Sequence, residues 1–132
     1  MIEQVKINNF LYSLIIRNEP SQKGVNFISS EDDILQVGTM CHPAGYRIKP
    51  HRHLPCTRNI KGTQEVLFIK SGILKVIFFD QNNINVGNVL LLKGDTIILL
   101  DGAHGFEIIE DIDMIEVKNG PYVASSDKVH LD

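Results

Sequence analysis

The stretch "EVLFIKSGILKVIFFD", from Glu65 to Asp80, consists of two apolar runs separated by Ser71 and Gly72. Short runs rich in Val, Ile, Leu and Phe, bounded by turn residues, are typical of β-strands. A Ser-Gly pair between two such runs can supply the positive φ of a tight hairpin. The stretch therefore predicts two antiparallel strands, Glu65 to Lys70 and Ile73 to Asp80, joined by a short turn.

The same pattern of short apolar runs separated by Gly, Asn and Asp continues through most of the chain after Ile34. The other candidate strands are Ile34 to Met40, Gly45 to His53, Asn88 to Leu92, Thr96 to Leu100, His104 to Ile109 and Met114 to Lys118. Ahead of Ile34, the run "FLYSLII" and the residues before it fit either a helix or a pair of strands. About eight antiparallel strands with no helical pattern between them predict an all-β fold, a double-stranded β-helix or jelly-roll barrel.

Length and composition favour a single globular domain. The chain has 132 residues, of which 43% are hydrophobic and 22% charged, and one core can form at this size. The net charge of -3 and the scattered Lys and Arg residues argue against nucleic-acid binding. No apolar run approaches the roughly 20 residues of a membrane span, and the start lacks a secretory pattern. We therefore expect a cytoplasmic protein without membrane contact, whose two cysteines, Cys41 and Cys56, form no disulfide.

The strand pattern divides the chain into three parts. We expect residues 34–118 to form the barrel, residues 1–33 to be an N-terminal extension packed on it, and residues 119–132 to be a polar surface tail. Alternation places large apolar side chains on the face opposite the predicted site, namely Tyr46, Ile48, Val66 and Phe68. This second apolar surface packs either against the other sheet or in a homodimer, and we expect a homodimer.

His51 and His53 are the first candidates for chemistry. Residues two apart in a strand point to the same side, so both imidazoles can reach a common point. Glu65 and His104 each open a later strand, at ends that a barrel mouth would bring together. Three imidazoles and a carboxylate suit one divalent transition metal, such as Zn, Fe, Mn or Ni, with an open coordination position.

These residues resemble the first motif of small single-domain cupins. Gly45 is followed by five residues and then by His51, Arg52 and His53. Glu65 is followed by six residues and then by Gly72, as in that motif.

The stretch "GDTIILLDGAHGFE", residues 94–107, resembles the second motif, in which Gly102 makes the turn and His104 is the histidine. The resemblance covers about Ile34 to Lys118. It implies a jelly-roll metalloprotein whose metal ligands are His51, His53, Glu65 and His104.

The chain departs from the family pattern in two places. Eleven residues, "LPCTRNIKGTQ", separate His53 from Glu65, a much longer gap than in the family. A loop must therefore fold back before Glu65 can join the site, which leaves Gln64 and Cys56 as alternative fourth ligands. In the second motif, one residue instead of two separates Gly102 from His104.

Candidate substrate-binding residues flank the predicted metal ligands. Arg47 and Lys49 share the parity of the histidine pair, so in a continuous strand they would face the same side. Two cations beside a metal would favour an anionic small molecule, such as a carboxylate, a phosphate or an acidic sugar. The alternative is that both are solvated at the rim or pair with a carboxylate of the protein. Phe106 shares the parity of His104 and would give the pocket an apolar wall.

The sequence therefore predicts a metal-dependent enzyme that acts on a small anionic molecule. Isomerase, hydrolytic, lyase and dioxygenase chemistries all remain open, because an open metal position serves each of them. Two alternatives are a metal- or ligand-binding module without turnover, and a metal-free cupin that modifies sugars with its histidines as acid or base. The lack of a DNA-reading helix argues against a one-piece transcription factor.

Overall fold

The computed structural model describes residues 2–131 and is built from eight β-strands. The strands are β1 (Ile2–Ile7), β2 (Phe10–Ile16), β3 (Gly24–Phe27), β4 (Gly38–Cys41), β5 (Glu65–Phe79), β6 (Asn85–Leu91), β7 (Thr96–Leu99) and β8 (Ala103–Lys118). A single turn of 3-10 helix, η1 (Ala124–Ser126), follows them. The described residues contain no α-helix, and the predicted all-β class is confirmed. No helix among them is long and apolar enough to cross a lipid bilayer.

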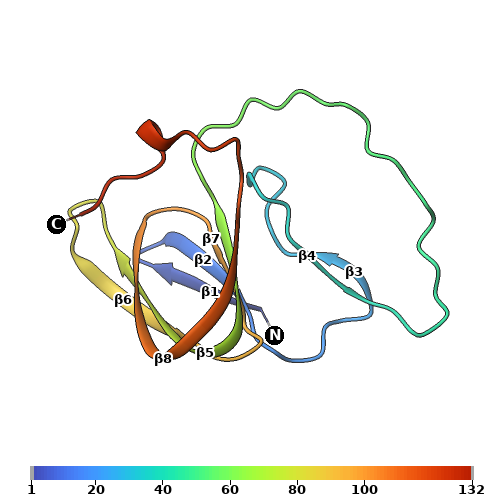
Figure 1. Cartoon of the computed structure of the whole chain (residues 1–132), viewed down its shortest axis with the longest axis horizontal. Coiled ribbons are helices and arrows are strands. Elements are labelled where there is room, and N and C mark those ends of the chain that lie inside the picture. The colour runs from blue at the N-terminus through green and yellow to red at the C-terminus, as the bar shows by residue number, and fades with distance from the viewer. Residues whose placement is uncertain (1, 132) are drawn as a thin grey trace.

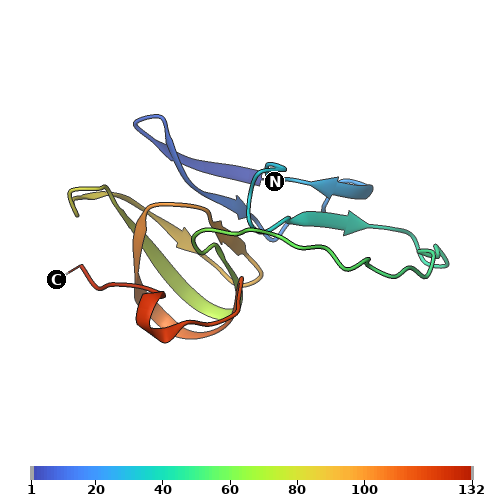
Figure 2. The ribbon, with the colours of Figure 1, turned by 90° about the horizontal axis from the view of Figure 1, so that it is seen from above.

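Six strands form one curled antiparallel sheet. Its order is β1-β2-β7-β5-β6, and β8 pairs with β5 along the other side of that strand. Figure 1 shows that the sheet curls into a half-barrel, with β8 closing over β5. The strands β3 and β4 pair only with each other in a separate two-stranded sheet, which lies beside the half-barrel in both ribbon views (Figures 1 and 2).

The prediction of a hairpin at Ser71 and Gly72 is wrong. Strand β5 continues through both residues, and β8 runs antiparallel beside its whole length, with register shifts on either side of Ser71. Gly72 has a φ of 91°, and a Cβ there would collide with the backbone of Asp111 on β8. A glycine bulge of this kind bends a strand without ending it. The two strands predicted from Glu65 to Asp80 are therefore one long bent strand, β5. The two predicted from His104 to Lys118 are likewise one strand, β8.

The residues ahead of Ile34 form strands instead of a helix. Asn8 and Asn9, with φ values of 51° and 64°, make the tight turn between β1 and β2. Strand β2 then pairs with β7, with Ser13 opposite Leu99. The first hairpin is therefore part of the main sheet. The sequence predicts that residues 1–33 are an extension packed on the barrel.

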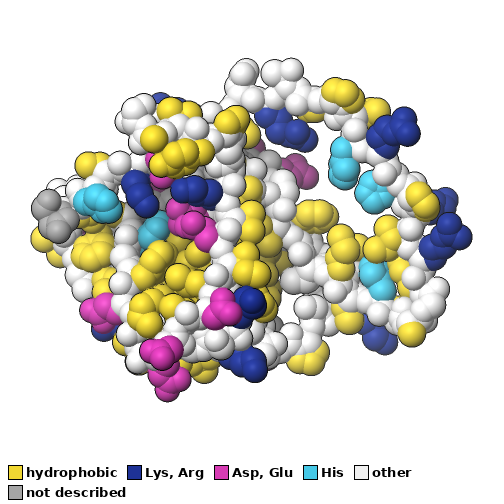
Figure 3. Space-filling model, in the orientation of Figure 1, with side chains coloured by type: hydrophobic (Ala, Val, Ile, Leu, Met, Phe, Trp, Pro, Cys, Tyr) yellow, Lys and Arg dark blue, Asp and Glu magenta, His cyan; other side chains and the backbone are white. Residues whose placement is uncertain are grey.

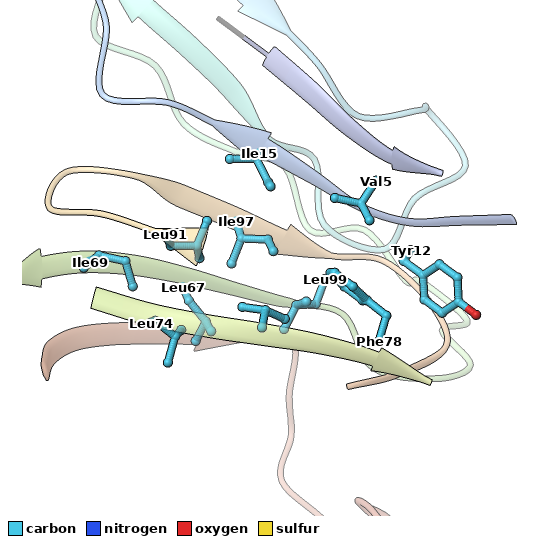
Figure 4. Close-up of a cluster of buried hydrophobic side chains, with 11 residues drawn as sticks. Val5, Tyr12, Ile15, Leu67, Ile69, Leu74, Phe78, Leu91, Ile97 and Leu99 are labelled. Carbon is cyan, nitrogen blue, oxygen red and sulfur yellow. The ribbon is translucent and has the colours of Figure 1, made fainter. Parts of the chain in front are cut away.

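The core lies on the concave face of the curled sheet. Alternate residues of β5 point into it, and β2, β6 and β7 contribute the opposing side chains (Figure 4). The fully or almost fully buried members include Ile15, Leu67, Ile69, Leu74, Val76, Phe78, Leu91 and Ile97. Period-two burial along β5 is what a strand with one core face requires.

A cluster of charged residues around the buried Asp95 joins three segments at one end of the sheet. Asp95, in the turn between β6 and β7, is 3% exposed and accepts hydrogen bonds from the backbone amides of Asn18 and Leu92, each at 2.9 Å. Arg17 donates to Asp95 at 2.9 Å and to Glu3 at 2.7 Å. The β1-β2 hairpin is thereby tied to the turn that precedes β7.

Residues 42–63 form a long extended loop, which we call the arm. The strand predicted from Gly45 to His53 does not form: the arm has neither strand nor helix. It leaves the molecule after β4, makes a wide excursion and returns just before β5 (Figures 1 and 2). Three of the five prolines of the chain lie in the arm, at positions 43, 50 and 55. Proline restricts the backbone to extended conformations and removes an amide donor, so it opposes pairing of the arm with itself.

Candidate functional site

Glu65 and His104 meet at the mouth of the half-barrel. Glu65 opens β5, where it pairs with Leu99 at the end of β7. The chain turns after Leu99 and enters β8, so His104 arrives beside Glu65 with 3.5 Å between Nε2 and Oε2. The side chain of Glu65 is 18% exposed and that of His104 is 27% exposed. The predicted strand-end positions of these two residues therefore do bring them together.

The neighbours of Glu65 keep it ionised. The imidazole of His104 lowers the pKa of the Glu65 carboxyl below its ordinary value, chiefly through direct side-chain interaction, while partial burial opposes this effect. The positive charge of Lys118, the cross-strand partner of Glu65, lowers the pKa further. An anionic carboxylate is the form that can bind a cation or orient an imidazole.

A cavity of about 520 Å³ opens next to this pair. Its walls come from β5, β7, the start of β8 and residues 127–131 of the tail. Phe106 is part of the wall, and its ring centroid lies 5.3 Å from that of His104. An ion pair of 3.4 Å between Lys118 and Asp127 holds the tail over the mouth. A volume of this size falls in the range of small-molecule sites, roughly 300 to 1,000 Å³.

The strand register agrees with the predicted alternation along β5 and β8. His104 pairs with Phe78 and Phe106 pairs with Val76, both core residues, so these β8 side chains face the concave side. The same register places Glu116, the partner of Leu67, on that face.

Glu116 and His130 also line the cavity. From the sequence, Glu107 and Glu116 are both possible general bases if they point inward, and the register places Glu116 on the cavity side. Sequence reasoning missed His130. The polar tail that contains His130 has no hydrophobic periodicity from which its position could be inferred.

His51 and His53 lie side by side on the arm. Their ring centroids are 5.3 Å apart. The Nδ1 of His51 is 2.9 Å from the backbone carbonyl of Lys49. Because a carbonyl can only accept, this contact puts the hydrogen on Nδ1 and leaves the Nε2 lone pair free for a metal, as in many metal-ligating histidines.

The four predicted metal ligands thus form two pairs instead of one group. The arm holds the His51 and His53 pair in its exposed part, away from Glu65 and His104 at the mouth. Across residues 2–131, no three His, Cys, Asp or Glu side chains lie close enough to hold one ion. The path of the arm is the direct cause, because the chain has already left the body before His51 and returns to it only within the long gap between His53 and Glu65.

The alternative fourth ligands have other surroundings. The side-chain oxygen of Gln64 accepts a hydrogen bond from the amide of Leu35 at 3.0 Å, and its nitrogen donates to Asp33 at 3.2 Å. Gln64 is therefore a structural anchor at the base of the arm. Cys56 is exposed on the arm, and both it and Cys41 are free thiols.

The predicted substrate-binding residues are likewise divided between the two places. Phe106 lines the cavity. Arg47 and Lys49 are exposed on the arm, close in sequence to the histidine pair. Their predicted common face assumed a strand, which this chain does not form there.

The chemistry of the donor set fits a divalent transition metal. The Nδ1 of His51 is engaged by a backbone carbonyl, so Nε2 is the atom available to a metal, and His104 lowers the pKa of the Glu65 carboxyl. Imidazole and carboxylate together suit Zn, Fe, Mn and Ni. The four residues could share one ion only if the arm pair and the mouth pair were brought together.

Comparisons of the chain with protein-family models, with curated proteins and with solved structures find no match. Its function is therefore inferred from the residues of the mouth and the arm alone.

Proposed function

We propose that this chain is a metal-dependent enzyme of the cupin type that acts on a small anionic molecule. One divalent transition metal would be held by His51, His53, Glu65 and His104. The observation that supports this proposal most directly is the Glu65–His104 pair, 3.5 Å apart at the edge of a cavity of about 520 Å³. A metal bound there would supply Lewis-acid chemistry next to a space that fits a small substrate.

The residues around the cavity have distinct proposed roles. Phe106 gives the substrate an apolar wall beside His104. Lys118 lies next to Glu65 in the sheet, and Arg47 and Lys49 accompany the histidine pair on the arm. These cations favour an anionic substrate, because fixed positive charge at a partly desolvated site attracts carboxylate or phosphate. Glu116 and His130 are placed to exchange protons with a molecule in the cavity.

A metal-free function is the second candidate. The mouth already contains a carboxylate beside an imidazole, without any contribution from the arm. A carboxylate that orients a histidine can make it a general base, as in catalytic triads. In this version the protein modifies a sugar nucleotide by proton transfer, with His104 as the base and Glu65 as its positioning residue.

Metal content separates the two candidates. Wild-type protein purified without chelator should contain one equivalent of a divalent metal per chain, measured by elemental analysis. His51→Ala and His104→Ala should each lower the affinity for the metal about tenfold or more, because each removes an imidazole ligand. His130→Ala is the matched control, since it removes an imidazole from the cavity wall that is not a proposed ligand. Stoichiometric metal in both ligand variants would contradict the site.

A turnover screen separates an enzyme from a binding module. The protein would be loaded in turn with Fe, Mn, Ni and Zn and tested on panels of carboxylates, sugar phosphates and sugar nucleotides. Turnover by the loaded protein that Glu65→Gln abolishes supports the proposed enzyme. Turnover of a sugar nucleotide by metal-free protein supports the second candidate. Tight metal binding with no turnover on any panel supports a binding module instead.

A further inference from the structure

The arm lies outside the folded body of its own chain. Every residue from 43 to 63 is exposed, and the space-filling view shows the arm enclosing an open space beside the body (Figure 3). Fixing the backbone of a residue in one conformation costs conformational entropy. No burial within the chain offsets this cost over the arm, so a defined arm requires a surface outside its own chain.

The arm has the composition of a segment that becomes covered. It exposes large apolar side chains, of which Leu54 is 81% exposed and Tyr46 and Ile48 are more than half exposed. Monomeric proteins rarely expose such side chains in a contiguous run.

Strand β8 offers a matching surface. It pairs only with β5, so within the described residues its second edge has unpaired backbone amides and carbonyls along Ala103–Lys118. It also exposes large apolar side chains on both of its faces, namely Phe106, Ile108, Ile115 and Val117. A long free strand edge of this kind is a template for the addition of an extended segment.

The arm and β8 are complementary in charge. The arm contains five basic residues, Arg47, Lys49, Arg52, Arg58 and Lys61, and no acidic residue. Strand β8 contains five acidic residues, Glu107, Glu110, Asp111, Asp113 and Glu116, and one basic residue, Lys118. Ion pairs of 3.5 Å with Lys75 and Lys70 engage Glu107 and Asp113, which leaves three carboxylates of β8 outside these pairs. Opposite charge of this extent favours and orients association.

The geometry of the chain directs the arm to a second copy. In both ribbon views the far part of the arm lies well away from β8, which belongs to the half-barrel (Figures 1 and 2). The end of the arm that leads into β5 is fixed to the body. Asn119 donates to the carbonyl of Gly62 at 3.1 Å and accepts from the amide of Gln64 at 2.9 Å. At the other end, His42 stacks on Tyr46 within the arm, with ring centroids 4.2 Å apart. An arm that extends away from the body is free to reach the β8 of a second copy, and two-fold symmetry would make such an exchange reciprocal.

We infer that two copies of the chain exchange arms and complete the metal site in trans. The arm of each copy lies along the free edge of β8 in the other and brings its His51 and His53 to the Glu65 and His104 of that copy. Residues 46–53 in an extended conformation span about 26 Å, the same as residues 103–110. Pro50 is tolerated on an added strand because its missing amide can face solvent there. The shared site rests on the proposed metal function; the docking of the arm does not.

Isotope-mixed crosslinking tests the docking without any metal. Equal amounts of chains labelled with nitrogen-14 and nitrogen-15 are unfolded together, refolded and treated with a carbodiimide, which joins a lysine to a carboxylate in direct contact. We expect amide links between Lys49 or Lys61 of the arm and the carboxylates of β8, in peptide pairs of mixed isotope. The intrachain contact between Lys75 and Glu107 is the internal control, because it must give pairs of one isotope only. Arm-to-β8 links of one isotope only, or none at all, would overturn the exchange.

Complementation between two variants tests the shared site. His51→Ala/His53→Ala removes the arm ligands, and Glu65→Gln/His104→Ala removes the mouth ligands. Each variant alone should lose stoichiometric zinc, while circular dichroism confirms that it is folded. After refolding together, each mixed dimer contains one complete site, so zinc should recover to about a quarter of the wild-type content per chain if pairing is random.

The two proposals fail in different ways. Zinc in the wild type without recovery in the mixture would overturn the site in trans and leave the metal function intact. Absence of zinc from the wild type, and of each other divalent metal supplied, would overturn the metal function and with it the shared site. Mixed-isotope crosslinks in that case would still support the docked arm.

Discussion

Asp95 shows how one buried side chain fixes the position of several segments. Its two oxygens bind Arg17 and the amides of Asn18 and Leu92. Asp95→Ala would leave these donors without their acceptor, and the loss of charged hydrogen bonds in a buried place should lower the free energy of unfolding by about 2 to 4 kcal/mol. Urea denaturation measures this change. Asp32→Ala, at an exposed position, is the control, and an equally small effect of both variants would contradict the role of Asp95.

Ser13 presents the opposite case, a polar atom without a partner. Its side chain is fully buried on β2, and among the described residues its Oγ has no hydrogen-bond partner. Ser13→Ala should therefore stabilise the protein by about 1 kcal/mol, because it removes a buried hydroxyl whose desolvation nothing offsets. Thermal denaturation would detect the rise, with the exposed Ser125→Ala as the reference. A clear loss of stability would show instead that the hydroxyl is hydrogen-bonded in solution.

The Glu3 carboxylate makes part of the stability dependent on acid. Its hydrogen bond with Arg17 lowers the pKa of Glu3 below the ordinary value of 4.5. Below pH 4.5 the unfolded chain therefore binds more protons than the folded one, so this contribution is complete above pH 4.5 and is lost as the pH falls through the lowered pKa. Glu3→Gln should weaken the acid sensitivity by about 1 kcal/mol or less, because the Glu3 side chain is 39% exposed. Unfolding measured between pH 3 and 6 provides the test (a range of about three pH units around the ordinary pKa); an unchanged pH profile would exclude this contribution.

At the scale of the element, Gly72 determines that β5 is one strand. Its positive φ and its approach to the backbone of Asp111 and Ile112 exclude a side chain. Gly72→Ala should therefore cost about 2 to 4 kcal/mol, from backbone strain and from a clash that rigid strands cannot relieve. Gly105→Ala is the matched control on β8, because its Cβ would find an ordinary contact 3.5 Å from Phe79. Equal losses in urea unfolding would mean that the bulge is not the constraint.

The sequence predicts the strands better than it predicts how they connect. Apolar runs such as "VLFI" and "TIIL" identify β5 and β7, because burial of one face depends only on local alternation. Ser71 and Gly72 serve equally in a hairpin or in a bulge, and only the distant partner β8 decides between them. Gly45 to His53 has the residue types of a strand, but the chain provides no partner strand for it.

The candidate site follows the same division between local and distant information. His51 and His53 are neighbours in sequence, so spacing alone predicts that they lie together. The meeting of Glu65 with His104 depends on the short connection from β7 to β8, which the turn residue Gly102 signals. The separation of the two pairs could not be predicted, because it depends on the path of a 22-residue arm (residues 42–63) that lacks any periodic pattern.

At the scale of the whole molecule, exchanged arms predict a protease sensitivity that depends on concentration. In a single chain the arm presents four trypsin sites, after Arg47, Arg52, Arg58 and Lys61, in an exposed, extended segment, because Pro50 blocks cleavage after Lys49. In a dimer the arm is covered. Cleavage between residues 47 and 61 should therefore slow about tenfold or more when the protein concentration is raised above that needed for dimers. Cleavage at Lys23, which lies outside the arm, is the internal reference. Equal rates for the arm at all concentrations would argue against exchange.

The tail that covers the mouth has a practical consequence for anyone who purifies this protein. Val129, His130 and Leu131 form part of the cavity wall together with Glu65. A polyhistidine affinity tag fused close behind Leu131 would begin beside that opening and bring surplus imidazoles to it. Such a handle would inflate apparent zinc uptake and hinder ligand entry. Handles fused ahead of β1, or removed by a specific protease before assay, avoid both artefacts.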